Sequence, residues 1–337
     1  MKKNIIKRII NTLIIIIVTI LVLYFSLKDN YEAIMNQIIT MNIWFVLLAF
    51  LFLILYWIFK SYSIYTFSKK MNKDFKFLQA VQLILRTQFF NAVTPFATGG
   101  QPFQVIYLKQ TGLDYASATS VVLQNFIVYQ IALVFLGLVA LFSNQIFHIF
   151  RKVYLLQKLI TLGFIINTLV IVIMFVVAFS KKMNKKLIGL AINILTKLHI
   201  VKNKEEKLQK WDETITKFHE GAKILLEDKK AFLLNILYNF LGLCCLYVIP
   251  LFLLYATGDF TSFNAGVAII TSAYIMIIGS FVPIPGATGG LEYGFMQFYG
   301  NFITGSALSA IMLIWRFITY YFGLMMGAVA LGIKRVK

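Results

Sequence analysis

The stretch Ser280-Phe-Val-Pro-Ile-Pro-Gly-Ala-Thr-Gly-Gly-Leu-Glu292 lies deep inside an apolar region and decides the fold class of this chain. Its two prolines remove backbone donors and its three glycines adopt φ/ψ values that other residues avoid, so a continuous helix cannot pass through it. A backbone break at membrane depth is tolerated only where protein buries it or where it lines a wet cavity, because lipid offers the amides no hydrogen-bond partner. The stretch therefore predicts a helix that breaks inside a membrane protein.

A second copy of this pattern occurs in the first half of the chain. Asn91-Ala-Val-Thr-Pro-Phe-Ala-Thr-Gly-Gly-Gln-Pro102 repeats the order of a valine, a proline and then Ala-Thr-Gly-Gly, so that residues 97–100 match residues 287–290. Paired broken segments in the two halves of a membrane protein indicate a substrate site between structural repeats. The alternative is two unrelated kinked spans that share a small-residue packing motif.

Composition places the chain among polytopic membrane proteins. Hydrophobic residues make up 60% and charged residues 13% of the chain, and the mean hydropathy is +0.81, whereas about a quarter of the residues of a soluble domain are charged. The net charge of +19 comes from lysines between apolar runs, which indicate topology signals and contacts with anionic lipids. No nucleic-acid partner is expected, because no aromatic-basic module or zinc spacing accompanies the charge.

Cysteine and histidine usage predicts no metal site and no disulfide framework. The two cysteines, Cys244 and Cys245, are adjacent inside an apolar run, and the three histidines are scattered over different segments. The sequence also lacks the GxSxG, HExxH and Walker motifs of hydrolases and nucleotide-binding enzymes. We therefore expect no catalytic residues and no cofactor.

Six apolar runs are long enough to cross a hydrocarbon core of ~30 Å, which takes about 20 residues. They cover residues 5–27, 43–67, 116–142, 155–179, 231–255 and 304–333. Two further regions, 77–113 and 262–302, are interrupted by the proline-glycine motifs, and each is either two short spans or one re-entrant hairpin. The predicted fold is an all-α polytopic membrane protein with about six full transmembrane helices plus two re-entrant hairpins in inverted repeats.

Charge between the runs predicts the topology, because Lys and Arg accumulate on the cytoplasmic side. Both termini are expected in the cytoplasm of a bacterium, beneath its inner membrane, and the acidic segment 28–41 is expected to be an outside loop. Re-entrant hairpins satisfy these placements if the first enters from the cytoplasm and the second from outside. The expected organisation is one domain, 1–337, with a repeat at about 43–142, an amphipathic cytoplasmic connector at 181–230 and an inverted repeat at about 231–333.

Three ionisable residues inside the apolar regions are candidates for a site. Glu292 follows the second Gly-Gly, Arg316 lies near the middle of the last span, and Arg86 lies in the first arm of the first hairpin. Each such residue costs about 2.5–3.5 kcal/mol at a helix centre and by default marks a function. A lipid phosphate is expected to compete for the arginine, and a cationic headgroup for the carboxylate. The alternative is a buried ion pair that only fixes the fold.

The hairpin tips supply the rest of the predicted site. A half-helix that begins after each Gly-Gly would direct free amides and a positive dipole end toward an anion such as phosphate. Polar side chains around the tips either satisfy the broken backbone or line a headgroup cavity, whereas the GxxxG at 323–327 predicts a helix-packing face. The predicted substrate-binding residues are Arg86, Thr98, Gly99, Gly100, Gln101, Thr288, Gly289, Gly290, Glu292 and Arg316.

These residues also carry a family resemblance. Residues 93–104 with Tyr107 and Leu108, and residues 282–294, resemble the two signature segments of the transmembrane domain of lysylphosphatidylglycerol synthases, the multiple peptide resistance factor family. The resemblance implies a flippase domain for aminoacylated phospholipid, in which Glu292, Arg316 and Arg86 are the acidic and basic intramembrane positions. In that family a separate C-terminal domain attaches lysine from charged tRNA to phosphatidylglycerol. Because this chain ends at Lys337, the resemblance implies the translocating half without the transferase half.

The functional hypothesis is a membrane lipid translocase. It moves an aminoacylated or other anionic phospholipid or glycolipid between leaflets and contributes to resistance to cationic antimicrobial peptides. The alternatives are a phosphatidylglycerol lysyltransferase and a membrane partner of a separate synthase. The expected partners are membrane lipids, a separate lipid synthase and further copies of the chain.

Overall fold

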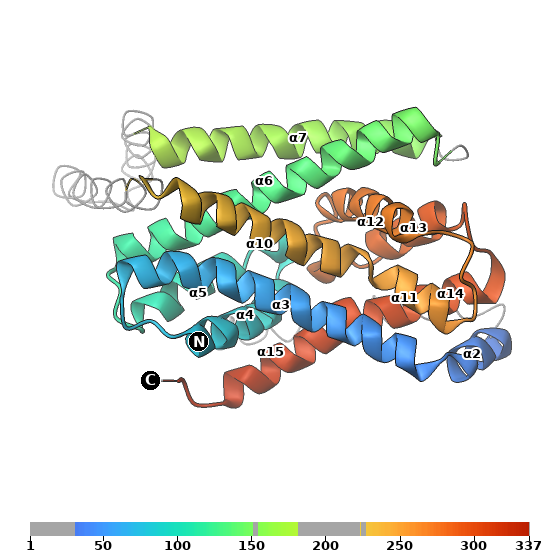
Figure 1. Cartoon of the computed structure of the whole chain (residues 1–337), viewed down its shortest axis with the longest axis horizontal. Coiled ribbons are helices and arrows are strands. Elements are labelled where there is room, and N and C mark those ends of the chain that lie inside the picture. The colour runs from blue at the N-terminus through green and yellow to red at the C-terminus, as the bar shows by residue number, and fades with distance from the viewer. Residues whose placement is uncertain (1–30, 151–153, 181–222, 224–226, 337) are drawn as a thin grey trace, which may run out of the picture.

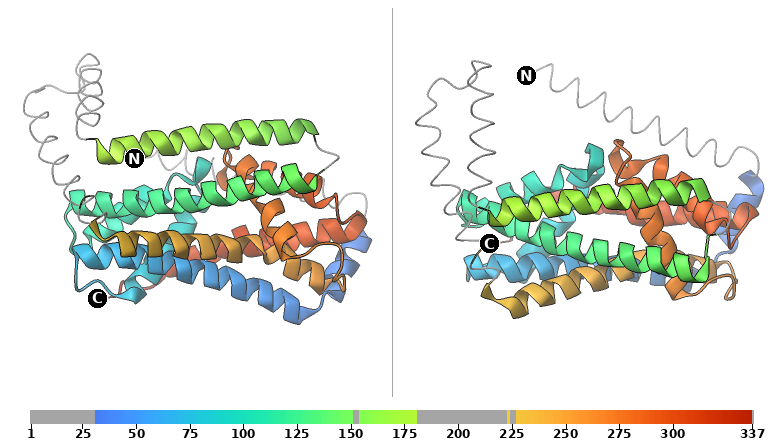
Figure 2. Two further views of the ribbon diagram at one scale, coloured as in Figure 1. Left: turned by 45° about the horizontal axis from the view of Figure 1, so that its top comes forward. Right: turned by 90° about the horizontal axis from the view of Figure 1, so that it is seen from above.

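The computed structural model describes residues 31–150, 154–180, 223 and 227–336, and this part of the chain is built from helices without strands (Figure 1). Two expected elements lie outside the described residues, namely the first span at 5–27 and nearly all of the connector at 181–230. The remaining chain forms one bundle whose long helices have axes roughly parallel to one another, with chain directions that alternate (Figure 2). The all-α prediction is therefore confirmed for the described ranges.

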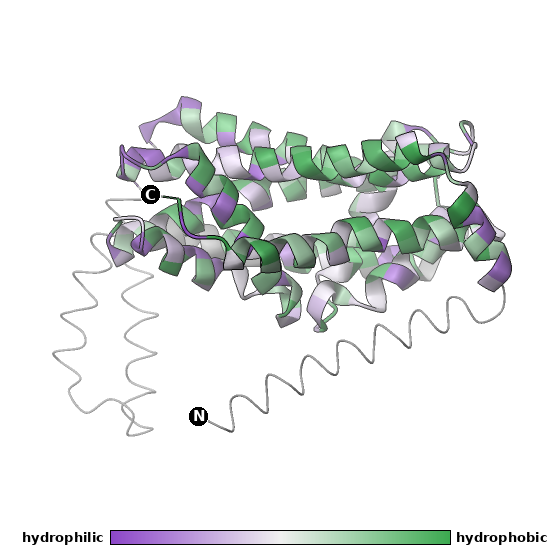
Figure 3. Ribbon diagram, turned by 90° about the horizontal axis from the view of Figure 1, so that it is seen from below, coloured by the Kyte–Doolittle hydropathy of each residue, from purple (hydrophilic) through white to green (hydrophobic). Residues whose placement is uncertain are grey.

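Within these ranges, five helical segments are long and apolar enough to cross a membrane. They correspond to five of the six predicted spans. Large apolar side chains such as Leu47 and Leu51 of the second predicted span are exposed on the outside of the bundle, and hydrophilic residues gather mainly toward the helix ends (Figure 3). The segments are α3 (Ile43–Met71), α6 (Tyr115–Phe147), α7 (Tyr154–Phe179), α10 (Lys229–Tyr247) with α11 (Ile249–Ala256), and α14 (Gly305–Arg316) continuing through η3 (Phe317–Phe322) into α15 (Gly323–Gly332).

Two of these segments are interrupted for identifiable reasons. Between α10 and α11 the chain bends next to Pro250, which lacks the amide that would continue the helical ladder. In the last span η3 is a π-helical turn directly after Arg316. Turns of this kind are rare and are found frequently at functional sites.

Each proline-glycine motif forms a helix-break-helix hairpin. The first consists of α4 (Phe77–Ala92), η1 (Pro95–Ala97) and α5 (Gly100–Lys109). The second consists of α12 (Ala265–Gly279), η2 (Pro285–Ala287) and α13 (Gly290–Tyr299). The hairpins lie toward opposite ends of the long helices (Figure 1), and their tips η1 and η2 contact each other, with Phe96 of the first tip 54% exposed.

The segment expected to be an outside loop contains a helix instead, α2 (Tyr31–Thr40). It packs against α14, and its Ile34 is only 2% exposed. A helix of this length is marginal alone in water. Tertiary packing therefore stabilises a helix in the segment predicted to connect the first two spans.

The GxxxG of the last span forms the predicted packing face. At Gly327 a Cβ atom would lie 2.6 Å from the Phe89 amide nitrogen, so only glycine lets α15 lie this close to α4. The last helix of the chain is therefore packed along the first hairpin, and the two halves of the sequence are joined directly beside the tips.

Candidate functional site

The two hairpin tips adopt the same unusual turn at matching positions. Phe96 and Ala97 both have φ of 53°, and Gly286 and Ala287 have φ of 65° and 50°. Left-handed backbone is uncommon for residues other than glycine and persists where the surrounding structure enforces it. The repeated sequence thus encodes a repeated three-dimensional turn after each tip proline.

Threonines satisfy part of the broken backbone. The hydroxyl of Thr98 donates to the Pro95 carbonyl at 2.9 Å, and the hydroxyl of Thr288 donates to the Pro285 carbonyl at 3.0 Å. In the first tip, Thr94 Oγ1 also accepts the Gly99 amide at 2.9 Å. The predicted site residues Thr98 and Thr288 are therefore structural equivalents that close the two turns.

Half-helices begin at the second glycine of each pair, Gly100 and Gly290, one residue earlier than the sequence predicted. At Gly100 a Cβ atom would lie 2.1 Å from Asn91 Oδ1, and at Gly290 it would lie 2.3 Å from Val282 Cγ2. These glycines let each half-helix approach the preceding arm closely. At α13 the free Gly289 amide donates to Glu292 Oε2 at 2.7 Å, so the chain's own carboxylate occupies this positive helix end.

The predicted acidic and basic residues form a buried ion pair. Arg316 Nε donates to Glu292 Oε1 at 2.6 Å, and Arg316 Nη2 donates to the Gly286 carbonyl at 3.0 Å. The two residues are 4% and 7% exposed. The guanidinium carbon lies 4.8 Å from the centre of the Tyr320 ring, whose hydroxyl donates to the Ala92 carbonyl of the first hairpin at 3.1 Å. Arg316 thereby connects α14 to the second tip, and Tyr320 connects η3 to the first.

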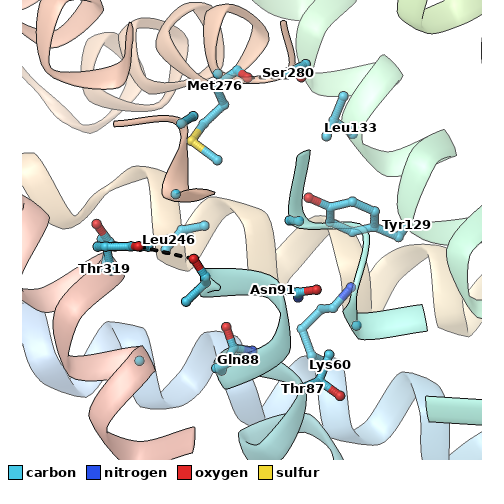
Figure 4. Close-up of a pocket in the computed structure, with 18 of the residues that line it drawn as sticks. Lys60, Thr87, Gln88, Asn91, Tyr129, Leu133, Leu246, Met276, Ser280 and Thr319 are labelled. Carbon is cyan, nitrogen blue, oxygen red and sulfur yellow. Dashed lines mark hydrogen bonds between the residues drawn. The ribbon is translucent and has the colours of Figure 1, made fainter. Parts of the chain in front are cut away.

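A cavity of about 640 Å³ lies where the tips meet the long helices. Three predicted site residues, Gly100, Gln101 and Arg316, line it directly. The predicted residues Thr98, Gly99, Thr288, Gly289, Gly290 and Glu292 belong to the tip turns and the half-helix starts beside it. Figure 4 shows that side chains from different helices point into the space. Further polar lining residues are Lys60, Thr87, Gln88, Asn91, Gln104, Asn125, Tyr129, Gln130, Asn167, Ser272, Ser280, Thr319 and Tyr320.

Arg86 is not brought together with the other predicted residues. It does not line the cavity, and its Nε and Nη2 donate to the carbonyls of Ala330 and Ile333 at 2.9 and 2.6 Å. Gln82 of the same helix donates to the Lys334 carbonyl at 2.8 Å. The position that the sequence assigned to substrate therefore holds the end of the last helix and the segment that follows it.

Lys60 of α3 lines the cavity and was missed by the sequence argument. Its Nζ donates to Asn239 Oδ1 at 3.2 Å and lies 3.9 Å from the centre of the Tyr129 ring. The signal was present, because a lysine inside the predicted span 43–67 is as costly as the charges that were selected. Its position near the basic end of that span made it resemble an ordinary topology signal.

Lys60 adjoins a hydrogen-bonded network between three long helices. Asn239 of α10 donates to Ser63 Oγ at 2.8 Å, and Ser63 of α3 donates to Asn125 Oδ1 of α6 at 2.7 Å. All three residues are buried. Hydrogen bonds between helices satisfy polar groups that lipid cannot, so this network fixes the helix that carries Lys60.

Long apolar helices around two broken hairpins, with a partly polar cavity at the meeting point of the tips, define a polytopic membrane protein. The chain belongs to the family described as the lysylphosphatidylglycerol synthase TM region, whose model matches residues 9–327. The chain is also similar to a UPF0104 membrane protein of Archaeoglobus fulgidus, with 24% identity over 335 aligned residues that cover 96% of each protein. The family resemblance expected from the tip motifs is thus confirmed.

Proposed function

We propose that this chain is a lipid translocase that carries the headgroup of an anionic phospholipid or glycolipid through the cavity between the two tips. The observation that carries the proposal is a cavity of about 640 Å³ with polar and apolar lining residues within a bundle of apolar helices. Ligand sites commonly have volumes of about 300–1,000 Å³. A headgroup in this space would keep polar partners while its acyl chains stay in lipid.

The hairpins supply the geometry for alternating access. The proposal treats both as re-entrant, with the first entering from the cytoplasm and the second from outside, and it treats the regions 43–142 and 231–333 as inverted repeats. The matching left-handed turns at Ala97 and Ala287 and the position of the hairpins toward opposite ends of the bundle support this assignment. Rocking one repeat against the other would expose the cavity to each side in turn.

The proposed cellular setting is a bacterial inner membrane with both termini in the cytoplasm. The positive-inside rule supports this orientation of the termini. Membership of the lysylphosphatidylglycerol synthase TM family supports a role in lipid handling. Moving an anionic lipid from the outer to the inner leaflet would lower the negative surface charge that cationic antimicrobial peptides meet, so the proposed cellular effect of transport in this direction is resistance to such peptides.

The proposal is tested with a cavity-filling substitution. Leu133→Trp adds bulk to a residue of α6 that lines the cavity, and Leu138→Trp is the matched control, because Leu138 is on the same helix and 40% exposed. Proteoliposomes carry phosphatidylglycerol with a fluorophore on an acyl chain, and a membrane-impermeant reductant quenches the outer leaflet. We expect the wild type and Leu138→Trp to equilibrate the leaflets and Leu133→Trp to slow this exchange severalfold. Equal exchange in wild-type and protein-free liposomes would exclude translocation of this lipid.

A second arm addresses the enzymatic alternative. The purified chain is incubated with phosphatidylglycerol, charged tRNA and radiolabelled lysine. Transfer of label to lipid would make the chain a lysyltransferase. Transfer only after a separate synthase is added would make it a synthase partner.

A further inference from the structure

The charge on Lys60 has no acidic partner in the described part of the chain. The ion pairs there join Lys70 to Asp228, Lys223 to Glu227, and Arg316 to Glu292. Lys60 instead has an amide oxygen and the face of an aromatic ring as neighbours. An ionisable residue kept inside a membrane protein without a counter-ion marks a functional site by default.

The neighbours of Lys60 leave donors for a ligand. A lysine ammonium has three N–H donors, and one is directed to Asn239 Oδ1. The Tyr129 ring stabilises the cation through its π face but accepts no full hydrogen bond. Since Lys60 borders the cavity, its remaining donors are available to an anion that enters the space.

The second cation of the cavity does not need a ligand in the same way. The carboxylate of Glu292 neutralises the charge of Arg316. The Nη1 group of Arg316 has no hydrogen-bond partner among the described residues. No described lining residue carries a carboxylate. With Lys60 protonated, the net charge of this lining is therefore positive and comes from Lys60.

We propose that Lys60 is the residue that selects the headgroup, and that the cavity binds a phosphate group of net negative charge and discriminates against a headgroup made cationic by an attached lysyl group. For a lipid as the source of the phosphate, this rests on the proposed function. The anion site itself rests only on Lys60, its neighbours and the acid-free lining. A lysyl ester would bring its ammonium groups into a space that holds an uncompensated cation, where like charges repel.

A purely structural role makes a different prediction. If Lys60 only joined α3 to α10 through Asn239, removing its charge would act like weakening the adjoining network at Ser63. Ser63→Ala removes a hydroxyl that bonds both Asn239 and Asn125 but leaves the cation in place. Comparing Lys60→Gln with Ser63→Ala thus separates anion recognition from helix positioning.

Binding to the detergent-solubilised full chain provides the primary test. The probes are dioctanoyl phosphatidylglycerol, its lysyl ester, dioctanoyl phosphatidylethanolamine and water-soluble glycerol phosphate. We expect the wild type to bind phosphatidylglycerol at least about tenfold more tightly than the lysyl ester, and Lys60→Gln to lose about tenfold for the anionic lipid, because one charge-assisted hydrogen bond is lost. Lys60→Arg retains the preference, and so does Lys69→Gln, which removes an exposed cation from the same helix.

Two results would overturn the inference. One is equal binding of phosphatidylglycerol and its lysyl ester by the wild type, a result that does not depend on whether any variant folds. The other is an equal loss for every probe in Lys60→Gln that Ser63→Ala reproduces. Binding of glycerol phosphate as tight as that of the lipid would support the anion site and identify a soluble anion as its source. Charge-selective binding without leaflet exchange would leave the inference standing and reject the translocase proposal.

Discussion

Arg316 and Glu292 lie 24 residues apart in sequence, and the structure joins them through a 2.6 Å contact between Nε and Oε1. The same carboxylate caps the Gly289 amide, and the same guanidinium donates to the Gly286 carbonyl. The pair therefore connects the backbone on both sides of Thr288. It is a structural element of the second tip, and its Arg316 also lines the cavity.

Removing one member of this pair is expected to destabilise the protein strongly. Arg316→Met leaves Glu292 as a buried carboxylate without its cation, and the loss of one partner of a buried pair costs about 3–5 kcal/mol. Glu292→Gln is expected to cost a similar amount, because Arg316 is left as a buried cation and the single amide oxygen can replace only one of the two carboxylate oxygens that accept from Arg316 and Gly289. Equilibrium unfolding in mixed micelles measures both effects.

A double variant provides the control for this prediction. Arg316→Met combined with Glu292→Gln should be more stable than the sum of the single losses predicts, since neither charge is left alone. The exposed pair Lys70 and Asp228 serves as the comparison, where the corresponding substitutions are expected to cost at most about 1 kcal/mol. Additive losses at Arg316 and Glu292 would contradict the structural coupling.

The contact between α15 and α4 predicts opposite effects at two glycines of one helix. Gly327→Ala places a Cβ 2.6 Å from the Phe89 amide nitrogen and should destabilise by about 1–3 kcal/mol. Gly332→Ala meets no atom within 4 Å and should be neutral or slightly stabilising, because alanine favours helix. Thermal unfolding of both variants measures these changes in stability. Equal changes at the two positions would contradict the close packing of α15 against α4.

Arg86 is expected to act on the C-terminal segment and not on headgroup selection. Arg86→Gln removes the donors to Ala330 and Ile333, so hydrogen exchange should accelerate in the segment 333–336. Leaflet exchange, if it changes, should change equally for all headgroups. A selective loss of leaflet exchange for lipids with anionic headgroups would instead indicate that Arg86 contacts the substrate.

The pH dependence of one surface contact can also be predicted. A hydrogen bond from Lys70 lowers the pKa of Asp228 below its ordinary value of 3.8, and a second from the Ala231 amide acts in the same direction. Because the folded-state pKa is depressed, the stabilisation is complete above the ordinary value and is lost as the pH falls through the folded-state pKa. Lys70→Met should raise the pKa of Asp228, measured by carboxyl carbon NMR. Lys69→Met is the control, and an unchanged midpoint in Lys70→Met would exclude the contact.

The sequence by itself determined the class of fold and the position of its breaks. Runs of apolar residues long enough to cross a membrane are a local property, so α3, α6 and α7 follow from composition and length. The breaks are local too, since Pro95 and Pro285 cannot continue a helical ladder and the following Gly-Gly pairs permit the turn. The pairing of Glu292 with Arg316 could be predicted from the sequence, because a single charge buried in a membrane protein is unfavourable without an opposite charge beside it.

Only the tertiary structure decided which side chains share the cavity. Arg86 and Lys60 are both cations in apolar helices, and their local sequence does not show which of them faces the cavity. Packing of α15 against α4 turns Arg86 toward the carbonyls at the end of the chain, whereas the crossing of α3 with α6 and α10 places Lys60 beside Tyr129 at the cavity. The physical reason is that side-chain direction follows from how helices pack, which depends on contacts between residues far apart in sequence.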